Sequence, residues 1–161
     1  MAFPEIKNNE IKDIKDPLHV YHFVVAHEND GVPPLYRAQL MNNDLTHAAL
    51  VMGGLHYDLR FGQQVSDLAG PTAPVAADLL IVDVHGMDSS TASTLQPLKD
   101  YLKKHTQTPY GIITMEEYEK SIKRAGFKNV IAHSATKERK IEFAGRLLLA
   151  AHDARLQSAH H

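Results

Sequence analysis

Four consecutive apolar residues, Leu79 to Val82, form the clearest strand pattern in the chain. They show no alternation with polar residues, which is typical of a strand buried on both faces of a parallel sheet. The stretch from Ala77 to Ser90 therefore predicts a central strand that ends at Asp83 and leads into a loop. Ligands of open α/β sheets bind at the carboxyl ends of the strands, so Asp83 is a candidate site residue.

Alternating strand and helix patterns extend to both sides of this central strand. The run HVYHFVVA is rich in β-branched and aromatic residues and predicts a first strand. Later helices are indicated by apolar residues at helical spacing and by start and stop residues, such as Pro97 in a first turn and Gly126 after a last turn. The expected elements are a strand 19–26, a helix that begins at Ser93 or Thr94, a strand 110–114, a helix 116–125, a strand 129–133 and a helix 141–155.

The region between the first strand and the central strand has the weakest patterns. Residues 35–41 are loosely helical and predict a short helix. The run THAALVMGG predicts a second strand over 46–54, and residues 57–68 predict a helix with Leu59 and Leu68 weakly spaced.

Five alternations of strand and helix predict an α/β fold with a five-stranded parallel sheet. We expect the flavodoxin-like strand order 2-1-3-4-5, with helices on both faces and right-handed crossovers. Residues 1–18 are polar and predict an N-terminal arm, 19–157 the α/β domain, and 158–161 a tail in which His160 and His161 resemble part of a tag.

Composition removes several classes of function. A chain of 161 residues suits one domain, and the lack of cysteine excludes disulfides, thiolate metal sites and cysteine nucleophiles. A formal net charge of −2 argues against nucleic-acid binding. No apolar run approaches the roughly 18 residues of a membrane span, and the N-terminal residues lack a signal-peptide core. We therefore expect a cytoplasmic protein without membrane partners.

Polar residues follow four of the five predicted strands. Because the carboxyl ends of parallel strands lie at one edge of the sheet, we expect these side chains to gather there. They are Glu28 and Asp30 after the first strand, Asp83 after the third, Thr114 after the fourth, and His133 and Ser134 after the fifth.

The stretches ADLLIVDVHGMDSS, TPYGIITM and RAGFKNVIAHS resemble the second half of a response-regulator receiver domain, the phosphorylated module of two-component signal transduction. The likeness in element order extends over about 19–155. It implies that Asp83 is the phospho-acceptor, and that Glu28, Asp30 and Asp83 form an acidic pocket that holds Mg²⁺. It also implies that Thr114 is the hydroxyl that follows the phosphoryl group during switching.

The chain departs from the receiver pattern at the position of a lysine. His133 or Ser134 stands where receivers place this lysine, and an imidazole poorly replaces a permanent ammonium beside a phosphate. The resemblance is therefore to a degenerate receiver, or pseudo-receiver, in which phosphorylation at Asp83 is lost or altered. We expect it to act through protein–protein interaction, with a kinase, a downstream signalling protein or a second copy as partner, and not as an enzyme.

Two alternatives remain open at this stage. The stretch VDVHGMDSS also resembles a STAS-type anti-sigma-antagonist module, in which Ser89 or Ser90 is phosphorylated at the start of a helix. The stretch ITMEEYEKSIKRAGFKNV resembles part of a class I methyltransferase, the only enzyme hypothesis, although no glycine-rich loop follows the first strand. Asp83 and Thr114 also have a purely structural interpretation as residues that end strands and cap the next turn.

Overall fold

A five-stranded parallel sheet forms the middle layer of the structure, a computed structural model that describes residues 20–27, 34–51, 55–74, 77–84 and 91–159. The strand order is β2-β1-β3-β4-β5, and every pair of neighbours is parallel, which confirms the predicted fold class. In chain order the elements are β1 Tyr21–His27, α2 Pro34–Val51, β2 Tyr57–Gln64, the short 3-10 helix η1 Val65–Ala69, β3 Leu79–Val84, α3 Thr91–Lys104, β4 Tyr110–Thr114, α4 Glu116–Arg124, β5 Val130–Ala132 and α5 Lys137–Ala159.

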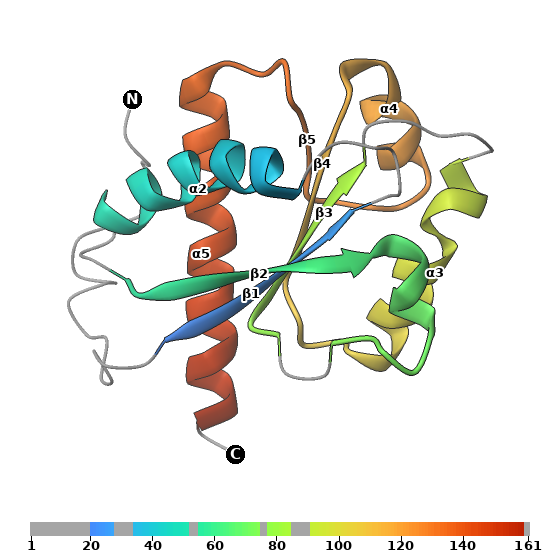
Figure 1. The fold of residues 1–161 in the computed structure, drawn as a ribbon, viewed down its shortest axis with the longest axis horizontal. Coiled ribbons are helices and arrows are strands. Elements are labelled where there is room, and N and C mark those ends of the chain that lie inside the picture. Colours follow the sequence, from blue (N-terminus) through green and yellow to red (C-terminus); the bar gives the residue numbers. More distant parts are fainter. Residues whose placement is uncertain (1–19, 28–33, 52–54, 75–76, 85–90, 160–161) are drawn as a thin grey trace.

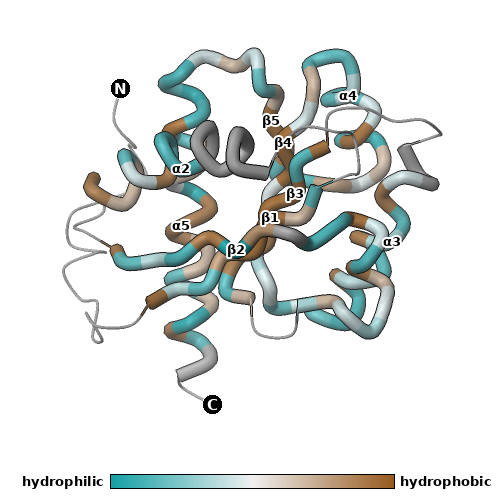
Figure 2. The backbone as a smooth tube through the Cα atoms, viewed as in Figure 1, coloured by the Kyte–Doolittle hydropathy of each residue, from teal (hydrophilic) through white to brown (hydrophobic). Residues whose placement is uncertain are grey.

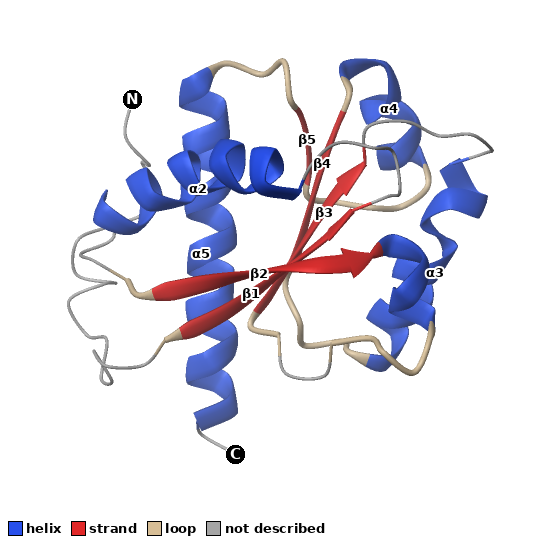
Figure 3. Cartoon of the chain, in the orientation of Figure 1, coloured by secondary structure: helices blue, strands red, loops and turns tan. Residues whose placement is uncertain are grey.

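Helices cover both faces of the sheet, as predicted. Helices α2 and α5 cross each other on one face, and α3, α4 and η1 cover the other (Figures 1 and 3). None of the helices in the described part of the chain is long and apolar enough to cross a membrane.

The central strand β3 is buried along its whole length, as the unbroken apolar pattern predicts. Alternate residues enter different apolar layers: Leu79 and Ile81 pack toward α2 and α5, whereas Leu80 and Val82 pack toward α3 and α4. In Figure 2 the hydrophobic residues accordingly gather in the middle of the sheet, along β1, β3, β4 and β5, whereas much of β2 is hydrophilic. Asp83 follows the first set, so its side chain belongs to the face covered by α2 and α5.

The prediction for residues 46–54 was wrong, because α2 continues through this stretch to Val51. Its buried residues, Leu45, Ala48 and Ala49, have the spacing of one helix face and pack in the same layer as α5. Leu50 is 71% exposed, so an apolar residue on the solvent side of the helix obscured this pattern.

The second strand is instead β2, in residues for which the sequence analysis predicted a helix. Tyr57, Leu59 and Phe61 alternate with polar residues and pack against the layer of α2 and α5. This period of two is the pattern of a half-buried strand. The five-strand order therefore holds with its second strand at Tyr57–Gln64.

Several helix boundaries also differ from the expectations. Helix α3 begins at Thr91, which places Pro97 inside it and not in its first turn. Helix α5 begins at Lys137, four residues before its predicted start. The expected end of α4 is confirmed, since Gly126 has a φ of 103°, a left-handed conformation that glycine adopts without strain.

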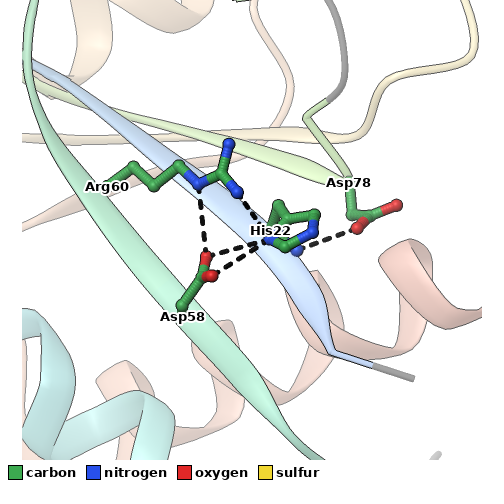
Figure 4. A network of polar contacts seen from close by, with 4 residues as sticks. All are labelled: His22, Asp58, Arg60 and Asp78. Atoms are coloured by element: carbon green, nitrogen blue, oxygen red, sulfur yellow. Dashed lines mark hydrogen bonds and ion pairs between the residues drawn. The ribbon is translucent and has the colours of Figure 1, made fainter. Parts of the chain in front are cut away.

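A polar network occupies the side of β1 and β2 that faces away from α2 (Figure 4). His22 Nδ1 lies 3.1 Å from Asp58 Oδ2, and Arg60 Nε lies 3.6 Å from Asp58 Oδ1. The backbone N–H of His22 donates to Asp78 Oδ2 at 2.8 Å. Among the described residues between β2 and β3 the helical element is the five-residue η1. Charged pairs therefore stand on this side of β1 and β2, where a long helix would need apolar contacts.

Gly111 of β4 allows α5 to approach the sheet closely. A Cβ atom at this position would lie 2.7 Å from Leu147 Cδ1 and 3.1 Å from Phe143 Cζ. We predict that Gly111→Ala lowers the free energy of unfolding by about 1–3 kcal/mol in urea denaturation, because the core is overpacked. Gly70→Ala is the control, since its Cβ makes only an ordinary 3.6 Å contact; an equal loss in both variants contradicts the close approach.

Tyr21 and His152 tie the start of β1 to α5 inside the core. Tyr21 Oη lies 2.8 Å from His152 Nδ1, and both residues are buried. We predict that Tyr21→Phe costs about 1–2 kcal/mol of unfolding free energy, because a buried imidazole nitrogen loses its partner. Tyr57→Phe, which removes hydroxyl bonds to Asn42 and Thr46 at the exposed surface, should cost less than half as much because water replaces them.

Candidate functional site

The candidate site centres on Asp83 near the carboxyl end of β3. Asp83 is 1% exposed, and its Oδ1 lies 2.9 Å from His133 Nε2. His133 directly follows β5, and its backbone N–H donates to the carbonyl of Thr114 at 2.8 Å. This backbone bond fixes the start of the β5–α5 turn, so that the imidazole reaches across β4 to the central strand.

The Asp83–His133 contact is a hydrogen bond with a defined donor. An ionised carboxylate only accepts hydrogen bonds, so Nε2 of His133 carries the hydrogen when Asp83 is charged. The same contact is an ion pair when the imidazole is protonated. Burial makes the bond important, since a carboxylate withdrawn from water is costly unless it is paired.

A second histidine stands beside Asp83 on the other neighbouring strand. His27 at the end of β1 is the register partner of Asp83, and alternation along β1 places its side chain on the same face as those of Phe23 and Val25. The ring atom Nε2 of His27 is buried. Asp83 thus has a histidine on each side of it, one from β1 and one that reaches over from β5. His27 is not among the predicted site residues, although it directly precedes Glu28 at the end of the first strand.

Thr114 lies at the same edge but faces the other layer. Asp83 pairs with Ile113 and Val84 pairs with Thr114, so alternation places the threonine side chain on the face that α3 and α4 cover. The residue is fully buried, and its Oγ1 has no hydrogen-bond partner among the described residues. The structure thus brings Asp83 and His133 together but directs Thr114 to the opposite side of the sheet.

Ser134 turns toward α4 and not toward Asp83. Its Oγ donates to Glu116 Oε2 at 3.2 Å, at an exposed surface next to Met115. Of the two residues predicted to take the place of the receiver lysine, His133 is therefore the one in contact with the carboxylate of Asp83.

The remaining candidate residues, Glu28, Asp30, Ser89 and Ser90, lie outside the described residues. Within the part of the chain that the structure describes, no group of three or more His, Cys, Asp or Glu is placed to hold a metal ion. The predicted Mg²⁺ pocket of Glu28, Asp30 and Asp83 and the phosphoserine at Ser89 or Ser90 accordingly stay predictions.

Comparison with models of protein families finds no match. Comparison with curated proteins finds no match either. Among solved structures, a pilus assembly-related protein from Burkholderia pseudomallei is similar with a TM-score of 0.51 and 16% identity, over 83% of this chain and 91% of that one.

Two further structures are similar at lower scores. A CheY-like response regulator from Mesorhizobium loti has a TM-score of 0.47 and 14% identity, over 78% of this chain and 96% of that one. A diflavin flavoprotein from Nostoc sp. has a TM-score of 0.47 and 16% identity, over 89% of this chain and 99% of that one. At such identities the likeness concerns the fold alone, and the chain has the α/β architecture of flavodoxin-like proteins with a parallel sheet.

Proposed function

We propose that this chain is a receiver-like signalling domain of the cytoplasm that acts by binding other proteins, with phosphorylation at Asp83 lost or altered. The observation that carries the proposal is the buried hydrogen bond between Asp83 and His133. The fold and the place of Asp83 at a strand end support a receiver-like domain, and the state of its carboxylate argues against an ordinary phospho-acceptor.

Attack on a phosphoryl donor needs a carboxylate oxygen that the donor can reach. Asp83 is 1% exposed and one of its oxygens is bonded to His133, so accepting a phosphoryl group requires this bond to break and the site to open. The product also needs a cation close to the phosphate. An imidazole that is already used as the carboxylate's partner supplies this charge less well than a free ammonium.

A domain that does not accept phosphate can still signal through its surface. In this proposal the fold presents fixed faces to a kinase, to a downstream signalling protein or to a second copy of the chain, and no reaction is catalysed. Mg²⁺ is part of this proposal only if Glu28 and Asp30 approach Asp83. The three carboxylates would then bind the ion, and Asp83 would still not accept a phosphoryl group.

The first test is chemical phosphorylation followed by intact-mass measurement. We predict that the wild-type chain, incubated with acetyl phosphate and Mg²⁺, gains no phosphoryl group, because the carboxylate of Asp83 is buried and paired. A phosphorylation-competent receiver domain in the same reaction controls for the reagent. Asp83→Asn gives the background at other residues. An acid-labile phosphoryl group on wild-type Asp83, absent from Asp83→Asn, would contradict a lost acceptor.

The second test concerns the partner. We predict that Asp83→Ala changes the affinity for a physiological partner by less than about threefold, because recognition in this proposal does not depend on the acceptor carboxylate. The partner is first recovered by affinity pull-down from the native cell. Its binding to purified wild-type and variant chains is then measured by calorimetry, with circular dichroism as a check that the variant is folded. A loss of tenfold or more in a folded variant counts against the proposal.

A further inference from the structure

A small pocket opens between α2 and α5, on the face of the sheet that carries Asp83. Its volume is about 70 Å³. Its floor consists of three isoleucines on adjacent strands, Ile81 of β3, Ile113 of β4 and Ile131 of β5. Side chains from the two helices, among them Leu45 and Leu147, form its walls.

The inside of this pocket suits hydrocarbon better than water. Protein interiors contain few spaces larger than one water molecule, which needs roughly 10–15 Å³. A water on the isoleucine floor finds few polar partners, so an apolar group gains free energy by replacing it. The pocket is small enough to limit that group to a few carbon atoms.

Two oppositely charged residues are among those that line the pocket. Asp44 of α2 and Lys140 of α5 line it. Burial raises the pKa of the Asp44 carboxyl, although Lys140, Lys137 and His47 act in the opposite direction. Lys140 and Lys137 therefore both act on the half-buried Asp44 carboxyl, so two ammonium groups accompany one carboxyl in this region. This balance attracts an anionic head group and repels a cationic one.

His133 belongs both to this pocket and to the candidate site. It lines the pocket, and its Nε2 is the hydrogen-bond partner of Asp83. A molecule in the pocket would therefore lie next to the residue whose side chain pairs with the Asp83 carboxylate.

We propose that the pocket between α2 and α5 binds a small aliphatic carboxylate, with its hydrocarbon body on the isoleucine floor and its carboxylate beside Lys140. This ligand site does not depend on phosphorylation or on partner recognition. The ligand-site proposal can therefore fail while the proposed function holds, and the proposed function can fail while the ligand site exists. Its effect on the signalling site, through His133, is relevant only if the function proposed above holds.

The test is an NMR titration of the ¹⁵N-labelled full chain with acetate, propionate, isobutyrate and isovalerate. We expect saturable shifts at Ile113, Ile131 and His133, with affinity that rises roughly fourfold for each methylene that becomes buried, until the pocket is full. Isobutylamine has the same isobutyl body as isovalerate and the opposite charge, so it should bind at least tenfold more weakly. No saturable shifts at these residues, or equal binding of the amine, would overturn the proposal.

Two variants separate the head-group contact from the apolar floor. Lys140→Met keeps most of the side chain's length and removes its charge, so it should weaken isovalerate binding at least fivefold. The matched control is Lys103→Met on α3, an exposed lysine of the other face, which should leave binding unchanged. Ala144→Val adds volume at the pocket wall and should weaken isovalerate more than acetate. Unchanged binding in folded Lys140→Met contradicts the assigned site.

Discussion

The hydrogen bond between Asp83 and His133 is the interaction on which the carboxyl edge of this sheet depends. A carboxylate at the end of a fully buried strand needs a partner, and in this fold the partner comes from the turn after the edge strand β5. The bond therefore spans β4 and links the central strand to the edge of the sheet. In the proposed function the same bond has a chemical consequence, because the partner that makes the buried acid tolerable also withdraws it from a phosphoryl donor.

The arrangement of the layers determines which polar side chains at this edge share a face of the sheet. Alternation along β3 sends Asp83 toward α2 and α5, and alternation along β4 sends Thr114 toward α3 and α4. The acid, the histidines and the isoleucine-floored pocket consequently share one face, and the threonine hydroxyl is separated from them by the sheet. A pocket and a polar site on the same face can be coupled by a single residue, and His133 has that position.

Sequence patterns predicted the fold correctly where the hydrophobic pattern of an element is unambiguous. The unbroken run Leu79–Val82 indicated the central strand, and the sheet order followed from the alternation of elements. The patterns failed between β1 and β3, because exposed Leu50 disguised a helix and the period of two in Tyr57–Gln64 ends at Phe61, before the strand does. In the site, the sequence placed His133 near the edge. Its bond to Asp83 depends on the turn geometry after β5, which no spacing along the chain reveals.

A double-mutant cycle on Asp83 and His133 tests the central claim most directly. The free energy of unfolding in urea is measured for the wild type, Asp83→Ala, His133→Ala and the double variant. A buried charge-assisted hydrogen bond predicts a coupling energy of about 1–3 kcal/mol between the two positions. Additive effects within about 0.3 kcal/mol would contradict the account, because they would mean that the two side chains do not hold one another in the folded protein.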